Sequence, residues 1–347
     1  MKTKIYLVIF ALLAVFAAYT IYTSSEKNST KAEKAFKVEN FEKVTKIVVT
    51  NRQTEEMVFE KQDESWILNG KYPVRTHLFE EMQEALTKME AVSPVPEVGK
   101  EAVLRQMIGG AIKVEVFKGK KLDKKVFIGG PNLKNTASHM FLEIDGEPSN
   151  RIYNVGIPGF RGYLTSRFNV NESQWRSKLI FSLAANEVKE VELNYNANAE
   201  NANFVLQNEN ANFSLKINNK EIEKTLINDA NVVNYLKMFD NQQVTSYVFT
   251  EPKEQYLKDS LLQVNKFADL KITDLKGNTT AVTIVNMPLN ESSKRQYDNN
   301  GDLFLYDQDY KYIVFGEEQD WGVVSRTKFG LILISPNLLL KNNAKTN

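Results

Sequence analysis

The segment Val44-Thr-Lys-Ile-Val-Val49 is predicted to form an alternating β-strand. Val188-Lys-Glu-Val-Glu-Leu193 is predicted to form another, 144 residues further along the chain. Short strand candidates follow each of them, at 57–60 and 65–68 in the first case and at 203–207 and 213–217 in the second. The order of parts is therefore the same in two halves of the chain, which suggests a duplicated domain.

An amphipathic helix is predicted after each set of strands. In the first half, the apolar residues at helical spacing are Leu78, Phe79, Met82, Ala85, Leu86 and Met89. In the second half, the same spacing recurs 154 residues on from the first four of them, in Val232, Val233, Leu236 and Phe239. Each stripe is wide enough to cover one face of a sheet.

Three further segments pair in the same order. Residues 113–119 match 271–277, residues 151–156 match 311–316, and residues 160–168 match 321–329. The separation rises from 158 to 161 across these pairs, as small loop insertions in a duplicated domain would require. The alternative is that these matches reflect only the order of strand, helix and strand that any two α+β domains share.

Turn residues between the strands favour hairpins. Asn69-Gly70, Asp145-Gly146 and Asn300-Gly301 each interrupt strand-like runs. Alternating strands joined by hairpins predict antiparallel sheets with one face covered by a helix. We therefore predict an α+β fold of two similar tandem domains, each with antiparallel strands and one main amphipathic helix.

The composition excludes several classes of function. The chain has 347 residues, with 44 Lys and Arg against 43 Asp and Glu, so it lacks the basic surface that nucleic acid requires. It has no cysteine and only two histidines, His77 and His139, which argues against disulfides, thiolate zinc sites and a three-histidine zinc site. We predict no cofactor and no metal.

The first 22 residues predict a membrane anchor. A basic start, Met1-Lys-Thr-Lys4, precedes eighteen uncharged residues at 5–22, which would span roughly 27 Å as a helix. That run is longer than the apolar part of a cleaved signal peptide, although cleavage is the alternative. We predict an anchor at 1–22, a polar tether at 23–37, a first repeat at 38–183 and a second at 184–347.

The orientation follows from the short basic N-terminal tail. Lys2, Lys4 and the terminal amine favour a cytoplasmic N-terminus. The expected location is the bacterial inner membrane, crossed once, with residues 5–22 in the lipid bilayer and the body in the periplasm.

Four segments resemble a bacterial family known as domain of unknown function 4340. They are Trp66–Arg75, Ile112–Phe117, Ile157–Leu164 and Trp175–Phe181, and the resemblance runs from about residue 38 to 240. It implies one N-terminal hydrophobic span and an extracytoplasmic body. Some relatives are encoded beside transporter components of the gliding-motility type, which implies a protein partner at the membrane. The family supplies no catalytic residues.

The densest unusual segment is Gly156-Ile-Pro-Gly-Phe-Arg-Gly-Tyr163. Phe160, Arg161 and Tyr163 could present a binding surface, because binding residues concentrate on loops held by rigid scaffolds. The structural interpretation is a corner after a strand, in which glycine supplies the backbone angles. We favour the corner.

Arg75, Trp175 and Arg176 complete the candidate surface, since Trp and Arg often dominate interfaces. The alternative for Trp175 and Arg176, which we favour, is a clasp between the two domains. The segment from Trp66 to Arg75 is interpreted first as a hairpin that covers the core. The segment from Gln296 to Asp302 departs from a calcium loop at critical ligand positions, so a hairpin turn is expected there.

Three functions are compatible with these features. The leading hypothesis is a membrane-anchored, periplasm-facing, non-enzymatic interaction module, accessory to an envelope or transporter complex. The alternative is an extracytoplasmic binder of glycans or peptidoglycan fragments, using Trp66, Tyr72, Phe160, Tyr163 and Trp175. An envelope hydrolase acting through carboxylates ranks last, because no catalytic motif is present.

Overall fold

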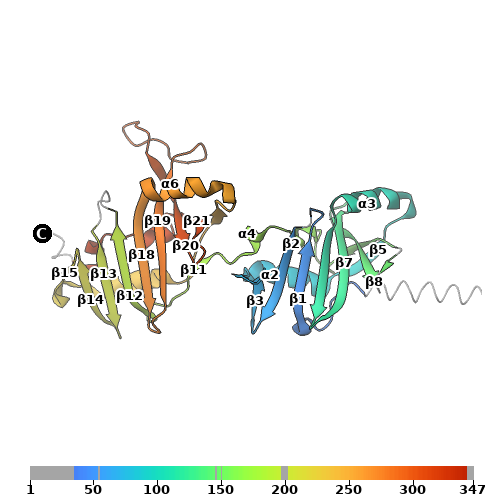
Figure 1. Ribbon diagram of the computed structural model, residues 1–347, viewed down its shortest axis with the longest axis horizontal. Coiled ribbons are helices and arrows are strands. Elements are labelled where there is room, and N and C mark those ends of the chain that lie inside the picture. Colours follow the sequence, from blue (N-terminus) through green and yellow to red (C-terminus); the bar gives the residue numbers. More distant parts are fainter. Residues whose placement is uncertain (1–34, 54, 145–146, 150, 197–201, 342–347) are drawn as a thin grey trace, which may run out of the picture. The chain divides into compact units, whose positions relative to one another are not determined.

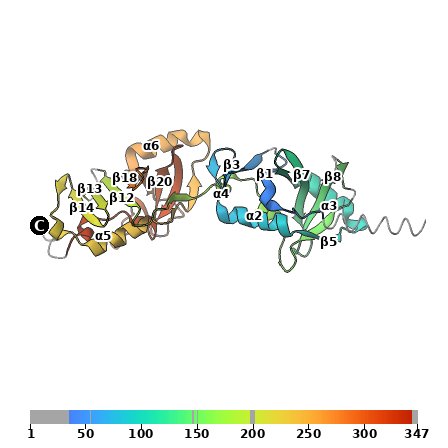
Figure 2. The same ribbon diagram turned by 90° about the horizontal axis from the view of Figure 1, so that it is seen from below.

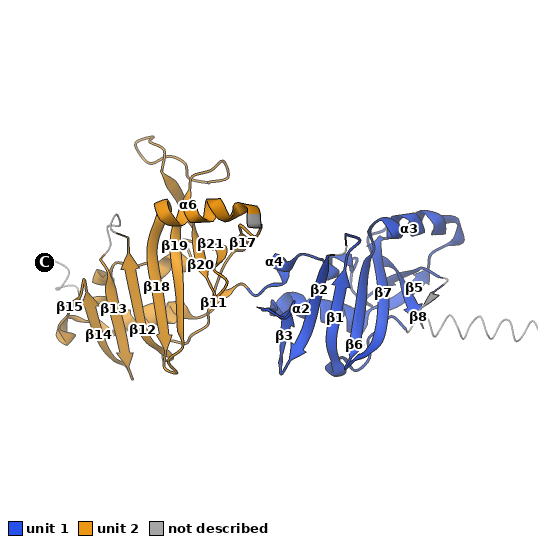
Figure 3. Cartoon of the chain, viewed as in Figure 1, with its two compact units in different colours: residues 1–177 blue, residues 178–347 orange. Residues whose placement is uncertain are grey.

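A computed structural model describes residues 35–53, 55–144, 147–149, 151–196 and 202–341. The chain divides into two compact units, unit 1 at 1–177 and unit 2 at 178–347 (Figure 3). The predicted membrane span at 5–22 and most of the predicted tether lie outside the described residues. Among the helices that are described, none is both long and apolar enough to cross a bilayer.

Both predicted domain boundaries shift. Phe36, assigned above to the tether, is fully buried against Tyr153 at a ring-centre distance of 5.7 Å, so the packed part of unit 1 includes it. Residues 178–183, assigned above to the first repeat, belong to unit 2. Phe181 packs there against Phe239 and Phe329.

Unit 1 contains a ten-stranded sheet, within the residues described, with the order β4-β3-β2-β1-β6-β7-β8-β10-β5 and β9 beside β8 (Figure 1). The strands are β1 Val44–Thr50, β2 Glu56–Gln62, β3 Ser65–Leu68, β4 Tyr72–Pro73, β5 Glu90–Pro94, β6 Ile112–Lys118, β7 Lys121–Pro131, β8 Ser138–Ile144, β9 Glu147–Pro148 and β10 Tyr153–Gly156. The helices are η1 Phe41–Lys43, α2 Thr76–Lys88, α3 Glu97–Gly110, η2 Thr165–Phe168 and α4 Glu172–Trp175.

Unit 2 contains a nine-stranded sheet with the order β15-β14-β13-β12-β18-β19-β20-β21-β17, and a small sheet of β11 and β16. The strands are β11 Leu179–Phe181, β12 Val188–Tyr195, β13 Phe204–Glu209, β14 Asn212–Ile217, β15 Lys220–Glu221, β16 Gln242–Gln243, β17 Ser246–Val248, β18 Lys266–Asp274, β19 Thr279–Pro288, β20 Tyr306–Phe315 and β21 Asp320–Ser325. The helices are η3 Lys224–Leu226, α5 Asp229–Leu236, η4 Lys237–Phe239, η5 Pro252–Glu254, α6 Gln255–Asn265, η6 Phe329–Leu331 and η7 Pro336–Leu339.

The two large sheets have the same strand order along the chain and across the sheet. In each, four strands are followed by a helix, an edge strand, a second helix and the remaining strands. The pairings in both are antiparallel, as in β1 with β6 and β12 with β18. The predicted α+β class with antiparallel sheets is confirmed.

Helix α2 packs on one face of the sheet of unit 1. Phe79, Met82, Ala85 and Leu86 are its buried residues, and they join a core that includes Val126 and Ile128 from β7. Because side chains alternate along a strand, Phe127 points to the opposite face. That second face carries α3, whose one buried residue is Met107.

Unit 2 repeats this arrangement, with α5 and α6 on opposite sides of the sheet (Figure 2). Ile284 and Ile313 belong to the core beneath α5. Their neighbours Val285 and Val314 belong instead to a separate cluster with Leu261 of α6. Each unit therefore has a core helix on one face of its sheet and a second helix on the other.

The prediction of one main helix in each half missed α3 and α6. Each contributes a single buried residue, Met107 and Leu261, so neither produces a broad apolar stripe. The predicted match of 151–156 with 311–316 is also wrong, because those residues lie in β10 and β20, at different positions in their sheets.

Predicted turns form where asparagine and glycine adopt left-handed backbone angles. Asn69 and Gly70 have φ of 52° and 67° between β3 and β4, the left-handed angles that both central residues of a type I′ turn require. Gly301, with φ of 87°, follows Asp298, whose carboxylate accepts from the backbone N–H groups of Asn300 and Asp302. The Asp145-Gly146 turn lies outside the described residues.

Candidate functional site

Trp175 is a core residue rather than a surface residue. It is 1% exposed, its ring centre lies 4.9 Å from that of Phe59, and its indole Nε1 donates to the Asn169 carbonyl at 2.8 Å. Its own carbonyl accepts from the backbone N–H of Arg75. Trp175 therefore fixes the start of α2 from inside unit 1 and cannot contribute to a binding surface.

Arg176, the next residue in the chain, packs on the Tyr72 ring. The guanidinium lies 3.6 Å from the centre of the Tyr72 ring, and the residue is 6% exposed. A β-bridge joins Arg176 to Val74, and Arg75 is half-buried. These residues hold β4 and the start of α2 together, which is a structural role.

The glycine-rich loop places its remaining candidates at the surface. Phe160 and Tyr163 are 42% and 40% exposed, and Arg161 is exposed. Gly162 has φ of 153°, and a Cβ there would lie 2.8 Å from the Phe160 ring. The loop is thus a tight corner after β10, as the structural interpretation expects.

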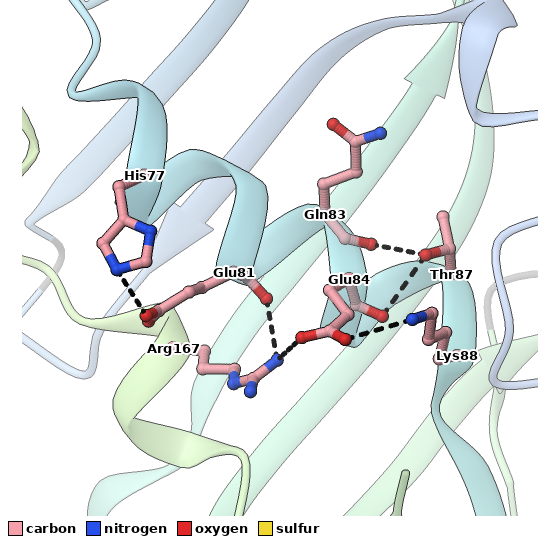
Figure 4. A network of polar contacts seen from close by, with 7 residues as sticks. All are labelled: His77, Glu81, Gln83, Glu84, Thr87, Lys88 and Arg167. Atoms are coloured by element: carbon pink, nitrogen blue, oxygen red, sulfur yellow. Dashed lines mark hydrogen bonds and ion pairs between the residues drawn. The ribbon is translucent and has the colours of Figure 1, made fainter. Parts of the chain in front are cut away.

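Arg167 fastens this corner to α2. It lies 4.8 Å from the centre of the Phe160 ring and donates to the Glu81 carbonyl and the Glu84 carboxylate, at 3.1 and 2.9 Å (Figure 4). Hydrogen bonds from Arg167 and Lys88 lower the pKa of Glu84. The positive charges of Arg167 and Lys88 are therefore both paired with Glu84 of α2. These contacts give the loop a structural role, which is to pack against α2.

The two histidines differ in environment. His77 is exposed and its Nε2 lies 3.2 Å from a Glu81 oxygen (Figure 4). His139 is 9% exposed in β8, and burial lowers its pKa. Among the described contacts, neither histidine has both a carboxylate and a hydroxyl nucleophile beside it.

A groove of about 410 Å³ lies between α3 and the outer face of the sheet of unit 1. Its walls are mainly apolar and consist of Leu104, Met107, Ile108, Ala111, Phe127 and Phe141. Phe127 and Phe141 stack at 4.6 Å with an angle of 12° between their planes. Ile108 is 66% exposed and Leu104 is 41% exposed at the rim. An apolar concave site with an open rim is typical of a binding site.

The groove also contains a buried hydroxyl without a partner. Thr50 is one of its lining residues, and its Oγ1, which is closed off from solvent, makes no hydrogen bond among the described residues. A buried polar atom left in this way costs about 1–3 kcal/mol. Arg52 and Lys113 lie at the same groove; Arg52 donates to the Gly109 carbonyl, and Lys113 pairs with Glu115 at 2.8 Å.

The corresponding place in unit 2 is filled. Leu261 of α6 packs with Val285, Val314 and Trp321. The Phe249 ring also covers Trp321, at a ring-centre distance of 5.4 Å. The open groove is therefore a property of unit 1 and is not imposed by the strand order.

Unit 2 has a different cavity, of about 290 Å³, on the core face of its sheet. Lys311 and Asn286 pair across β20 and β19 and both line it, with Arg326 and several aromatic rings. Burial lowers the pKa of Lys311 to about 8, with a further lowering from the nearby Arg326.

Sequence reasoning missed both sites. One wall of the groove, Leu104, Met107 and Ile108, belongs to a helix that was not predicted, so no pattern indicated that the strands on the other side form a groove with it. Lys311 could have been found, because Lys311, Ile313 and Phe315 alternate on one face of a strand. A lysine at an inward position breaks the expected apolar row.

Comparison of the chain with protein-family models, curated proteins and solved structures gives no match. The family resemblance noted from the sequence therefore stays a prediction.

Proposed function

We propose that this protein is a membrane-tethered, non-enzymatic interaction module on the periplasmic side of a bacterial inner membrane, accessory to an envelope or transporter complex. The observation that supports docking is the apolar groove of unit 1, with its unpartnered Thr50 hydroxyl. The proposed anchor is the uncharged run at 5–22, and the family resemblance is consistent with both parts.

The proposed occupant of the groove is an apolar segment of a partner protein. Its side chains would contact Phe127, Phe141 and Ile108, and a backbone group would pair with the Thr50 hydroxyl once the groove wall that covers this hydroxyl moves aside. A lipid acyl chain could fill the same apolar space but has no group that bonds a hydroxyl. Satisfying a buried polar atom is a strong source of specificity, so the hydroxyl favours a peptide.

We further infer that the two units arose by duplication and have diverged in what they bind. Their strand orders agree at every position, whereas the space beneath the second helix is open in unit 1 and filled in unit 2. One copy would then keep a docking groove that the other has lost.

The glycan-binding alternative receives less support. Trp175 is buried in the core, and Trp66 lies at 4.5 Å from the Phe79 ring centre and is only partly exposed. Two of the five aromatic residues assigned to that function thus serve packing.

Site-specific photocrosslinking tests the docking proposal. With a photoreactive benzoylphenylalanine at Ile108 in native membranes, we expect one discrete protein adduct. The same probe at Leu133, which is fully exposed and outside the groove, is the matched control and should give none.

The variant Thr50→Val sharpens the test. It keeps the side-chain shape but removes the hydroxyl, so adduct yield should fall about three- to tenfold, the equivalent of one hydrogen bond. Three outcomes would contradict the proposal: an adduct to lipid, an adduct whose yield is unchanged by Thr50→Val, or the same adduct from the probe at position 133.

A further inference from the structure

We propose that the cavity on the core face of unit 2 is a binding site for a small organic carboxylate with an apolar body, held by Lys311 and Arg326. The site is separate from the docking groove of unit 1 and does not depend on it.

The cavity lies where the apolar rows of the sheet end. Val282 and Ile284 of β19 pair with Phe315 and Ile313 of β20 in the core, and the next pair on that face is Asn286 with Lys311. The polar pair therefore forms the inner end of a cavity whose apolar wall is made by Phe267, Phe329 and Leu333.

Lys311 carries a charge in this cavity with no acid paired to it. Its Nζ donates to the Asn286 side-chain oxygen at 2.5 Å and lies 4.1 Å from the centre of the Phe267 ring. Among the described residues it forms no ion pair within 4.0 Å. Aromatic and amide contacts hold the ammonium in place, and the charge of Asp307 at the same cavity compensates it only in part.

Arg326 is the second cation at the cavity, and its guanidinium likewise has no ion pair within the described part of the chain. One acid, Asp307, lines the cavity together with the two cations, and its charge favours the ammonium form of Lys311. Asp309 pairs with Arg295 at 2.6 Å, and the buried Asp307 accepts from the backbone N–H groups of Asp309 and Tyr310. The two lining cations therefore exceed the one lining carboxylate of the cavity by a single positive charge.

The corresponding place in unit 1 is closed, which shows that the cavity is not required by the fold. There Val126 pairs with Leu142 and Ile128 with Met140, so Ser138 takes the position that Lys311 has in unit 2. The Ser138 hydroxyl accepts from the backbone N–H groups of Leu164 and Thr165, and Thr165 donates to the Gly129 carbonyl. In unit 1 this position thus holds a small serine whose hydroxyl is hydrogen-bonded within the unit. In unit 2 the same position holds a lysine that borders the cavity.

The shape and charge define the chemistry of the ligand. Two adjacent cations favour an anionic head group, and an arginine offers the paired donors that a carboxylate accepts. The apolar wall favours a hydrocarbon or aromatic body. At about 290 Å³ the cavity is at the lower end of the range for small-molecule sites. The single excess positive charge matches a singly charged carboxylate better than a doubly charged phosphate ester, whose tighter binding would be an adverse outcome of the test.

The test uses the full-length protein in a non-ionic detergent with three probes of similar size. Binding of 3-phenylpropionate, 3-phenylpropanamide and phenyl phosphate is measured by calorimetry and by the NMR shifts of the lysine side chains. We expect the carboxylate to bind at least tenfold more tightly than the amide and than the phosphate, and to move the Lys311 resonance.

Variants complete the test. Lys311→Met and Arg326→Gln should each weaken binding of 3-phenylpropionate about tenfold or more, and Lys328→Met, which removes an exposed charge outside the cavity, should not. Because Arg326 is exposed, its variant tests the proposal even if the Lys311 variant folds poorly. Equal affinity for acid and amide, tighter binding of the phosphate, or unchanged binding in both cavity variants would overturn it.

Discussion

Replacing Trp175 by alanine is expected to lower the free energy of unfolding of unit 1 by about 3–5 kcal/mol, the range for removal of a large buried aromatic side chain. The variant loses the edge-to-face contact with Phe59 and the hydrogen bond to the Asn169 carbonyl. It also leaves a cavity beneath the start of α2.

Hydrogen exchange of the amides of α2 and β2 measures this loss within unit 1, independently of unit 2. Tyr163→Ala is the matched control, because Tyr163 is 40% exposed in the corner loop, and it should cost less than about 1 kcal/mol. A loss below 1 kcal/mol for Trp175→Ala would contradict the core assignment and restore Trp175 as a surface candidate.

Replacing Lys311 by methionine is expected to stabilise unit 2 by up to about 3 kcal/mol at pH 7. The pKa of Lys311 is about 8 in the folded protein, against an ordinary value of 10.5, and each unit of difference is worth about 1.4 kcal/mol. The unfolded chain binds this proton more strongly, so the penalty is fully present below about pH 8. It decreases as the pH rises from 8 to 10.5.

The measurement is the difference in unfolding free energy between the native chain and Lys311→Met at pH 7 and pH 10. Taking the difference cancels groups that titrate independently of Lys311, such as the buried Tyr195, whose pKa is raised by burial. The gain should fall to about 1 kcal/mol at pH 10, and Lys328→Met should show none at either pH. A gain that is the same at both values would show that burial of charge is not its cause.

The sequence predicted those elements whose burial follows a simple period. The strands at 44–49 and 188–193 and the stripes of α2 and α5 each place several apolar residues on one face, and the structure contains all four. Helices α3 and α6 attach to the second face of a sheet through Met107 and Leu261. A single buried residue does not produce a helical repeat of apolar positions, so the sequence pattern did not indicate these two helices.

The candidate site was harder to predict than the fold. Trp175 and Arg176 lie in a stretch with little periodicity, and the sequence does not indicate that Phe59 and Tyr72 would cover them. The groove depends on α3 and on the stacking of Phe127 with Phe141, which are 14 residues apart on neighbouring strands. By contrast, Lys311 interrupts an alternating apolar row, so its inward position was accessible from the sequence.

Cysteine accessibility tests the central claim most directly, because the chain contains no cysteine and single substitutions can be labelled cleanly. Ile108→Cys reports on the rim of the groove, and Leu133→Cys on a fully exposed site away from it. In the purified protein both should react with a maleimide at similar rates.

In intact cells, a membrane-impermeant maleimide should label Leu133→Cys as before. Ile108→Cys should react at least about tenfold more slowly, a protection of 1.4 kcal/mol or more, and adding Thr50→Val should restore its labelling. If Ile108→Cys reacts as fast in cells as in the purified protein, the groove is not a docking site. If neither cysteine is labelled from outside, the body does not face the periplasm.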